Sequence, residues 1–501
     1  MNLGIDLGTT FSLAAHLNPQ GMPTLVPDAR QAQSFRTPSV VGIQGRQAWV
    51  GQTLEDLLLD EPGCPIVRGF KQHMGSDLQP YTDPQGRGWP PEALSALILG
   101  KLLHDVETLY AEAIDHCLIT VPANFSDAQR KATQGAAALA GLRRVSLIEE
   151  PIAAAAYYGF THKEAEQTLL VYDFGGGTFD ASVLHIAAGR LYVLATEGDS
   201  QLGGRGIDQA LVQTLQAEVR QRYGIDVSGD RGAQEALRRF AEAAKIGLGQ
   251  PGHGLMRKTL VLGGRACELA LSPQQVHAVV QPAVDATLAA AQRALEGAGL
   301  GWGQMDQVLL VGGSSLLPQV ARSLSARSGK PPGALVARHP HQAVAYGAAL
   351  LAESALDTAL EPVHQGVAPY HLGLRVRDAA GQPQVQVLVK RNSPLPARAT
   401  TTVYTHRADQ ARLIFDIVQS KSPAEPELSL GHFAFGPLRS PRVNYPVELQ
   451  LAYDTEGLVR VTAKDLVTGE LLQRELAASG ESDVARLGRG RELLSTVQLM
   501  T

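Results

Sequence analysis

The first two thirds of the chain alternate short apolar runs with segments that have helical periodicity. Apolar runs at residues 3–7, 12–17 and 116–121 predict buried strands. From residue 92 to residue 113 the apolar side chains recur at helical spacing, which predicts a helix. The alternation continues to about residue 355 and is typical of an α/β fold with a largely buried sheet.

One pattern occurs twice in this region. Residues 4–10 (Gly-Ile-Asp-Leu-Gly-Thr-Thr) predict a strand that ends in Asp-x-Gly and a turn of small residues. Residues 169–180 repeat the plan, with a strand that ends at Asp173 and a turn that contains three consecutive glycines at 175–177. Two lobes built on similar plans, facing each other across a cleft, would explain this duplication.

After residue 355 the pattern changes to alternation with a period of two. Residues 361–367 have no periodicity and predict a linker. The alternating segments that follow are residues 385–389, 413–417, 447–453 and 459–463. They predict an antiparallel β-sandwich over residues 368–480, and we expect residues 481–501 to form a short tail.

Composition narrows the classes of function. The 501 residues are 44% hydrophobic and 19% charged, as in an ordinary soluble globular protein. Lys and Arg number 44 against 49 Asp and Glu, so the net charge of −5 offers no surplus for nonspecific nucleic-acid binding. We expect short arginine-rich segments, such as residues 486–491, to be solvated.

Targeting and cysteine patterns indicate the compartment. No run of about 18 or more apolar residues occurs, so we expect no membrane span, and the N-terminus lacks the pattern of a signal peptide. The three cysteines, Cys64, Cys117 and Cys267, lie far apart without the spacing of a zinc site or a disulfide framework. We therefore expect reduced thiols and a cytoplasmic protein.

Glycine-rich turns after buried strands are typical phosphate-binding sites, because unpaired backbone N–H groups converge there without a Cβ in the way. The Gly-Thr-Thr turn is weak evidence alone, but three consecutive glycines at 175–177 indicate that something approaches the backbone closely. Asp6 and Asp173 end equivalent strands, and two carboxylates beside phosphates repel each other unless a cation intervenes. Mg²⁺ suits this position because it prefers oxygen ligands and keeps several waters.

Two further features are ambiguous on their own. The glycine turn at residues 312–314 follows a buried strand and is by itself a generic βα loop. On the predicted helix over residues 234–249, Glu242 and Lys245 lie off the apolar stripe. They are either solvated charges or residues that reach a ribose, and their spacing leaves both readings open.

Six motifs occur in a specific order. They are Ile-Asp-Leu-Gly-Thr-Thr at 5–10, Ile-Thr-Val-Pro-Ala at 119–123, Glu-Pro at 150–151, Asp-Phe-Gly-Gly-Gly-Thr-Phe-Asp at 173–180, Leu-Gly-Gly at 202–204 and Val-Gly-Gly at 311–313. Together with the β-rich region they closely resemble the seventy-kilodalton heat-shock chaperone family (DnaK-type), to about residue 480. The chain is similar to the short, specialised HscC-like bacterial members.

The resemblance implies a two-lobed, actin-like ATPase domain over residues 1–360, then a peptide-binding β-sandwich without a helical lid. It implies ATP and Mg²⁺, with Asp6 and Asp173 positioning the metal through its waters. The residues implied to hold the ATP phosphates are Gly8, Thr9, Thr10, Gly175, Gly176 and Gly177. Those implied for the adenosine pocket are Gly203, Gly204, Glu242, Lys245, Gly312, Gly313 and Ser314.

The resemblance also implies catalytic and relay residues. Lys71 matches the family's catalytic lysine, which helps to place the attacking water, although by sequence alone it would be an ordinary surface lysine. The set implied around that water, the metal and the γ-phosphate is completed by Glu150, Asp173, Thr178 and Asp180. Pro122 and Arg130 match a switch and relay pair that carries the nucleotide state towards the second domain.

In the sandwich, the resemblance implies a groove for an extended hydrophobic peptide. The residues that fall along this groove are Leu374, Tyr404, Leu413 and Phe415, and the alternative is that they are simply sandwich core. Backbone hydrogen bonds would give affinity without sequence choice. The implied partners are unfolded or extended client polypeptides, and further candidates are a J-domain co-chaperone and a nucleotide exchange factor; we expect no nucleic acid and no membrane.

The chain departs from the family pattern in three ways. We expect no room for the helical lid, so bound peptide would exchange fast. Residues 362–366 replace a leucine-rich linker, which is expected to weaken docking between the domains. Ile246 and Leu316 stand where many members place arginines that sandwich the adenine, so nucleotide affinity is expected to fall.

Three functions remain open on these grounds. The first is a chaperone that hydrolyses ATP slowly and holds client segments. The second is an actin-like-fold kinase of a small metabolite, which shares the phosphate turns but has no use for a sandwich. The third is a nucleotide-gated binding module with little or no hydrolysis.

Overall fold

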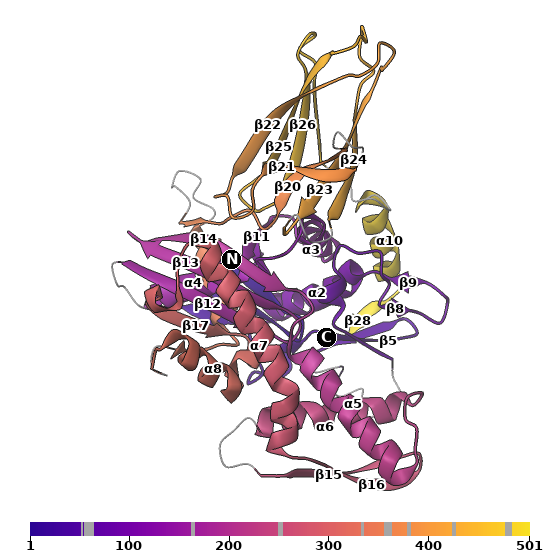
Figure 1. Ribbon diagram of the computed structural model, residues 1–501. Coiled ribbons are helices and arrows are strands. Elements are labelled where there is room, and N and C mark those ends of the chain that lie inside the picture. Colours follow the sequence, from indigo (N-terminus) through magenta and orange to yellow (C-terminus); the bar gives the residue numbers. More distant parts are fainter. Residues whose placement is uncertain are drawn as a thin grey trace.

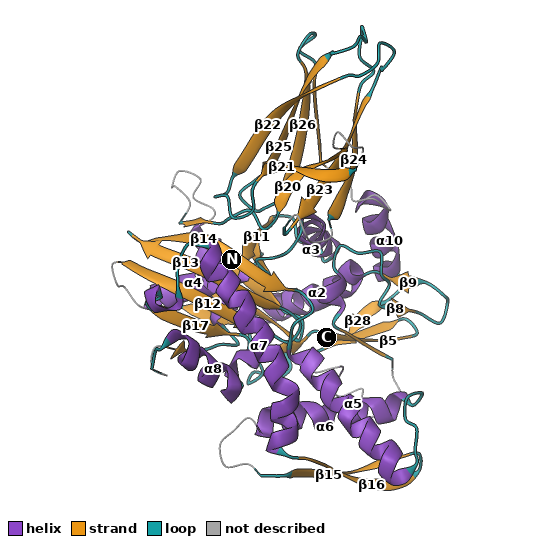
Figure 2. Ribbon diagram, in the orientation of Figure 1, coloured by secondary structure: helices purple, strands orange, loops and turns teal. Residues whose placement is uncertain are grey.

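The computed structural model describes residues 1–51, 54, 65–161, 166–248, 254–331, 335–354, 363–377, 382–422, 427–475 and 483–500. Two α/β lobes form the base, and an all-β domain stands on one end of them (Figures 1 and 2). The predicted α/β region and the antiparallel sandwich after it are both confirmed. Cys64 and the first two residues of the predicted linker lie outside the described residues.

The first lobe is built on a sheet in the order β11-β10-β1-β2-β3, with β4 also paired to β2. Its strands are β1 (Asn2–Leu7), β2 (Phe11–Leu17), β3 (Pro23–Leu25), β4 (Thr37–Pro38), β10 (His116–Val121) and β11 (Val145–Glu149). The helices beside it are α2 (Pro91–Tyr110) and α3 (Asp127–Leu139). Ser126 and Gln129 form a reciprocal capping box that starts α3, because each side chain satisfies a backbone N–H at the helix end.

The second lobe repeats the plan, in the order β18-β17-β12-β13-β14-β19. Its strands are β12 (Glu166–Phe174), β13 (Phe179–Ala187), β14 (Arg190–Asp199), β17 (Gln307–Val311), β18 (Leu335–Val336) and β19 (His364–Gln365). In each lobe one strand has a parallel neighbour and an antiparallel hairpin partner: β1 pairs with β10 and β2, and β12 with β17 and β13. The predicted duplication is therefore confirmed at the level of strand pairing.

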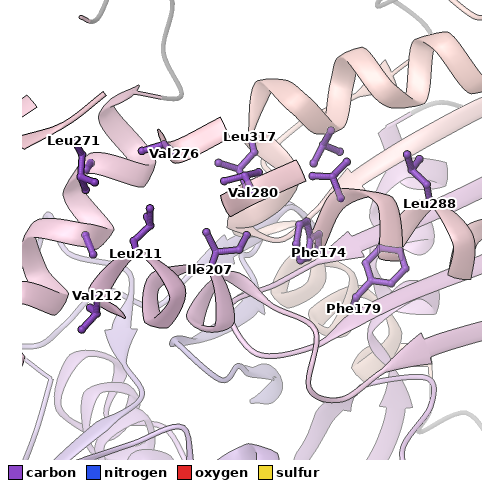
Figure 3. Packing of buried hydrophobic residues seen from close by; sticks show 14 of the residues in the cluster. Phe174, Phe179, Ile207, Leu211, Val212, Leu271, Val276, Val280, Leu288 and Leu317 are labelled. Atoms are coloured by element: carbon purple, nitrogen blue, oxygen red, sulfur yellow. The ribbon is translucent and has the colours of Figure 1, made fainter. Parts of the chain in front are cut away.

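Helices α4 (Glu150–Thr161) and α9 (Ala343–Ser354) pack against each other between the two sheets. A Cβ on Gly347 would lie 1.7 Å from the carbonyl oxygen of Ala153, so these helices approach as closely as their backbones allow. The second lobe carries α5 (Gly204–Tyr223), α6 (Arg231–Leu248), α7 (Pro273–Gly297), α8 (Pro318–Ser328) and the hairpin of β15 (Met256–Leu262) and β16 (Arg265–Leu271). Figure 3 shows their core, in which Ile207 of α5 lies between Leu211 of the same helix and Phe174, and Val280 of α7 and Phe179 belong to the same cluster.

The sandwich consists of two four-stranded sheets, β21-β20-β23-β24 and β22-β25-β26-β27. Its strands are β20 (His371–Arg377), β21 (Pro383–Val389), β22 (Ala397–Tyr404), β23 (Leu413–Ser420), β24 (Leu428–Phe435), β25 (Pro446–Tyr453), β26 (Val459–Asp465) and β27 (Leu471–Glu475). The inward-facing residues form a hydrophobic cluster separate from those of the lobes. The period-two pattern of the sequence therefore marks its inner face correctly.

The described part of the linker is not irregular. His364 and Gln365 form β19, which adds a parallel strand to the edge of β14. The sandwich hydrogen bonds to both lobes, because Arg130 of the first lobe donates to the carbonyl of Glu456 and Arg391 of the sandwich donates to Glu197 of the second lobe, whereas the expected weakening of docking stays a prediction.

The C-terminal segment folds back onto the first lobe. Helix α10 (Asp483–Ser495) lies beside α2 and α3, and β28 (Gln498–Met500) adds a parallel strand to β6 (Gln47–Val50) (Figure 1). In the same small sheet, β6 is followed by β5 (Val40–Gln44) and β7 (Ile66–Arg68).

The predicted solvation of residues 486–491 is wrong for Arg486. This side chain is buried and forms an ion pair of 3.1 Å with the buried Glu92 of α2. The segment after the sandwich is thus part of the first lobe rather than a free tail.

Leu493 of α10 lies in the hydrophobic cluster of the first lobe with 5% of its surface exposed. We expect Leu493→Ala to lower the free energy of unfolding of this lobe by about 2–4 kcal/mol, because it removes buried methyl groups and leaves a cavity. Tryptophan fluorescence during urea unfolding measures this, since Trp49 and Trp89 both lie in the first lobe. Leu471→Ala, at a side chain that is 60% exposed, is the control. Equal stability of the two variants would contradict the assignment of α10 to the core.

Candidate functional site

A cavity of about 630 Å³ lies between the two lobes. Its lining combines both copies of the duplicated strand and turn with the third glycine turn. The predicted residues that line it are Asp6, Gly8, Thr9, Thr10, Lys71, Glu150, Asp173, Gly175, Gly176, Thr178, Gly312 and Gly313. The structure therefore brings together residues from five separate stretches of the sequence.

The two glycine turns face each other at contact distance. A Cβ on Gly176 would lie 1.9 Å from Thr10 Oγ1, and a Cβ on Gly177 would lie 2.4 Å from Thr9 Cγ2. A Cβ on Gly203, the residue before α5, would lie 2.6 Å from the backbone of Gly177. Only glycine allows this approach, which explains the three consecutive glycines.

Two buried polar atoms in this region have no hydrogen-bond partner among the described residues. They are Thr10 Oγ1 and Asp180 Oδ1. Buried polar atoms are normally satisfied, so the hydroxyl of Thr10, which lines the cavity, indicates where a polar ligand binds, whereas Asp180 is not among the lining residues. The turns supply backbone N–H groups at the same place, a combination that fits a phosphate chain.

Asp6 and Asp173 end their strands on opposite sides of the cavity. Burial, followed by the charge of Glu150, raises the pKa of Asp6 to about 7. Burial likewise raises the pKa of Asp173 well above its ordinary value, and Glu150, Asp180 and Asp6 add to this effect. A bound cation would relieve the cost of ionising both groups.

The described residues contain no group of three or more His, Cys, Asp or Glu side chains placed to hold a metal ion. The pair of Asp6 and Asp173 places two buried carboxyl groups at the cavity, which fits a cation such as Mg²⁺ that takes its other ligands from water and phosphate. Such binding through water is what the sequence predicts for these two residues.

Lys71 is buried, in contrast to the surface position that sequence alone suggests. It lies in the short helix η1 (Phe70–His73) and forms an ion pair of 2.8 Å with Glu150, the first residue of α4. Its ammonium group also lies 5.6 Å from the centre of the Phe125 ring.

Thr178, in the turn before β13, and Asp180, on β13, are both buried, and Asp180 is 1% exposed. Burial and the charge of Glu150 raise the pKa of Asp180 to about 8.

The residues expected around an adenosine lie on the far side of the glycine turns. Lys245 is buried, forms an ion pair of 2.7 Å with Asp208 and donates to the carbonyl of Gly204 at 3.2 Å. Ser314 donates to the carbonyl of Gly175 at 2.8 Å. Glu242 is half-buried and accepts from Arg238 at 2.8 Å. Lys245 is thus not a solvated charge, whereas a contact with ribose stays a prediction for both residues.

Ile246 and Leu316 are exposed, at 59% and 48%. Aliphatic side chains at these positions lack the planar guanidinium group that stacks on a base.

Several residues that sequence analysis missed connect the two lobes. Gln72, next to Lys71, donates to the carbonyl of Gly177 at 2.7 Å and accepts from Arg205 at 3.1 Å. Arg68 and Glu235 form an ion pair of 3.0 Å across the cleft. Ordinary polar residues at these positions carry no signal in a single sequence, because only the folded chain brings them to the opposite lobe.

The predicted relay pair lies where the sandwich meets the first lobe. Pro122 is buried directly after β10. Arg130 is fully buried, forms an ion pair of 3.1 Å with Glu149 and donates to the carbonyl of Glu456 at 2.7 Å. Asp127 accepts from the backbone N–H of Val459 at 2.7 Å. A relay role for Pro122 and Arg130 stays a prediction, but Arg130 contacts both domains.

The second lobe meets the sandwich close to Asp180. Lys421, just after β23, donates to the carbonyl of Gly198 at 2.6 Å, and Gly198 lies opposite Asp180 in the pairing of β13 with β14. Arg391 forms an ion pair of 2.9 Å with Glu197 beside it. The charge of Lys421 counteracts the rise in the pKa of Asp180.

Three of the four residues predicted to line a peptide groove are buried in the sandwich. Leu374, Leu413 and Phe415 are 3–7% exposed and belong to its hydrophobic cluster, whereas Tyr404 is 50% exposed. Their placement corresponds to the alternative interpretation, sandwich core, for the first three. A peptide pocket at these residues therefore stays a prediction.

Comparison with known proteins adds one finding. The model of a family described as Hsp70 protein matches residues 2–487, which is nearly the whole of the 501-residue chain. Among the described residues, no helix is both long enough and apolar enough to cross a membrane.

The contact between the glycine turns can be tested directly. We expect Gly176→Ala to raise the dissociation constant for nucleotide at least about tenfold, because its Cβ cannot coexist with Thr10 Oγ1 and the turns must separate. Isothermal titration calorimetry measures this affinity. Gly206→Ala is the matched control, because a Cβ there has no neighbour within 4 Å. Unchanged affinity in the Gly176 variant would place the nucleotide elsewhere.

Docking of the sandwich should depend on pH through Glu456. Burial, followed by the charge of Asp454, raises the pKa of Glu456 from 4.5 to about 7 in the docked arrangement. The docked state therefore favours the neutral acid, so this contribution is complete below about pH 4.5 and is lost as the pH rises through about 7.

Small-angle X-ray scattering at about pH 5.5 and about pH 8 measures the change, as a larger radius of gyration at the higher pH. We expect Glu456→Gln to reduce this pH dependence and the exposed Glu470→Gln to keep it. An identical pH response in the two variants would contradict the role of Glu456.

Proposed function

The chain belongs to the Hsp70 family, and we propose that it is an ATP-dependent molecular chaperone that hydrolyses ATP in the cavity between the lobes. In this proposal, the sandwich holds extended hydrophobic segments of unfolded or specific client polypeptides. The observation that carries the proposal is the direct opposition of the two glycine turns beside the buried pair of Lys71 and Glu150. The turns suit a phosphate chain, and the ion pair lies where its last phosphate would meet water.

The proposed chemistry is transfer of a phosphoryl group to water, which needs positioning and charge neutralisation more than covalent catalysis. Backbone N–H groups of the turns and the hydroxyls of Thr9, Thr10 and Thr178 hold the phosphates. Lys71 supplies positive charge beside the γ-phosphate, and its ion pair with Glu150 fixes its direction. Mg²⁺, when bound, neutralises charge on the phosphates, and Asp6 with Asp173 holds its water shell.

The attacking water needs a hydrogen-bond acceptor. Glu150 and Asp180 are the two candidates, and Asp180 has a buried Oδ1 without a partner among the described residues. An ionised Asp180 is required for this role, and its raised pKa of about 8 describes the protein without ligand. Cation binding beside it favours the ionised form.

Partners follow from the family. We propose client polypeptides as the substrate of the sandwich, with a J-domain co-chaperone and a nucleotide exchange factor as regulators. The main alternative is a nucleotide-gated binding module with little or no hydrolysis. The docking of the sandwich on both lobes favours this alternative, because bound nucleotide would then act by moving the sandwich and would not need to be hydrolysed.

Steady-state ATP hydrolysis separates these functions. We expect Lys71→Ala to reduce turnover by about two orders of magnitude, as is typical when a group that stabilises the transition-state charge is removed. Lys258→Ala, at an exposed lysine on β15, is the control and should keep the parent rate.

An extended hydrophobic peptide should change the rate of the parent protein if the sandwich is coupled to the cavity. Hydrolysis that depends on Lys71 and ignores peptide would leave an ATPase with an uncoupled binding module. Background turnover in both the parent and the Lys71 variant, together with tight ATP binding, would favour the non-hydrolysing alternative.

A further inference from the structure

Two of the loops at the end of the sandwich that points away from the lobes carry a cluster of arginines, and the loop between β26 and β27 lies at the same end. The two loops with arginines are residues 405–412, between β22 and β23, and residues 436–445, between β24 and β25. Strand β25 runs from Pro446, opposite Tyr404, to Tyr453, and the turn that follows it contacts the first lobe through Glu456. The two loops therefore lie at the opposite, free end, at the top of Figure 1.

The backbone joins these loops into one surface. Leu438 donates to the carbonyl of Ala411 at 2.8 Å, and Asn444 donates to the carbonyl of Thr405 at 2.9 Å. The Thr405 hydroxyl also donates to the carbonyl of Arg442. Residues from both loops are thus held side by side. We define the distal patch as Tyr404, Arg407, Arg412, Arg439, Arg442 and Val443.

The distal patch has a charge opposite to that of the whole protein. The two loops contain the four arginines of the patch against a single acidic residue, Asp409, in a chain with a net charge of −5. All four arginines are exposed. The nearest Arg407 and Asp409 atoms are 3.8 Å apart, and both side chains are more than three-quarters exposed, so this pair neutralises little. No other ion pair to these arginines is found among the described residues.

Apolar surface accompanies this charge. Tyr404 and Val443 are 50% and 51% exposed, and Leu466 and Val467 of the loop between β26 and β27 are 45% and 51% exposed. The main-chain hydrogen bond between residues 405 and 444 places Tyr404 and Val443 on neighbouring segments of the backbone. Loop 405–412 leads directly into β23, which carries Leu413 and Phe415 of the predicted groove.

Resting on the proposed function, we propose that the distal patch selects client segments in which acidic residues flank an apolar core. Arginine offers planar, bidentate hydrogen bonding to carboxylates, and Tyr404 and Val443 offer apolar contact beside it. A polypeptide can carry carboxylates and apolar side chains at neighbouring positions, so it can make both kinds of contact. A nucleic acid is disfavoured as occupant, because Tyr404 is the single aromatic ring of the patch and the protein as a whole is acidic.

The test uses the full chain and labelled peptides that share one leucine-rich core and differ in their flanks. The flanks are two aspartates, two glutamines or two lysines on each side. Fluorescence anisotropy in low and in moderate salt gives the dissociation constants. We expect the acidic peptide to bind about tenfold more tightly than the lysine peptide at low salt, and the gap to narrow as salt rises.

Two matched variants locate the effect. Replacement of Arg407, Arg412, Arg439 and Arg442 by Gln should abolish the preference among flanks, and replacement of the same four by Lys should retain most of it. The control replaces Arg257, Arg265, Arg322 and Arg327 by Gln, which are exposed on the second lobe and give the same change in net charge. It should behave like the parent.

The possible outcomes separate the two proposals. Equal binding of all three peptides would overturn the selection by acidic flanks while leaving client binding intact. Binding of none would overturn client binding itself. Tighter binding of a single-stranded RNA or of anionic lipid vesicles, lost in the Gln variant of the patch, would reassign the patch to another polyanion.

Discussion

Four buried carboxyl groups, Asp6, Glu150, Asp173 and Asp180, lie close to the charge of Lys71, and the first three of them line the cavity between the two lobes. Lys71 is already paired with Glu150, so Asp6, Asp173 and Asp180 share little positive charge, and burial raises the pKa of each. Ionising them is favoured by a cation, and in the proposed function this cation would arrive with a nucleotide whose phosphates the glycine turns would hold. A ligand that satisfies both demands stabilises the closed lobes by mass action. The closed arrangement of the lobes is therefore most stable when a ligand fills the cavity.

The segments that flank the sandwich in sequence bind one lobe each, and each segment pairs with the edge strand of a sheet. Strand β19 lies before the sandwich in sequence and pairs with β14 of the second lobe, and β28 lies after it and pairs with β6 of the first. Unpaired strand edges are available for such additions, since their N–H and C=O groups have no partner. A rotation of one lobe against the other must therefore displace the sandwich or break one of these attachments. Closure of the cavity is therefore coupled to the position of the sandwich.

The sequence predicts the layers of this fold because burial has a clear period. The alternation of β25 and the duplicated strand and turn are both local patterns, and each is found where it is expected. The burial of Lys71 and Arg486 could not be predicted, since each depends on a partner, Glu150 or Glu92, that is distant in sequence.

The predicted groove illustrates the other limit. In a sandwich, a side chain that lines a pocket and one that fills the core have the same alternation, so the pattern of Leu413 and Phe415 fits both.

Asp180 links the charge in the cavity to the docking of the sandwich. It lies opposite Gly198 in the pairing of β13 with β14 and accepts a hydrogen bond from the backbone of Asn124, and each of these residues has a contact from the sandwich: Lys421 donates to the carbonyl of Gly198, and Tyr370 donates to that of Asn124. Lys421 is also the cation that most counteracts the raised pKa of this carboxyl group. Withdrawal of the sandwich removes that charge, and the neutral acid becomes more favourable in a buried position. A neutral carboxyl group no longer accepts a proton from water, so the same contact that holds the domains together also sets the chemical state of a residue that we propose to orient the attacking water.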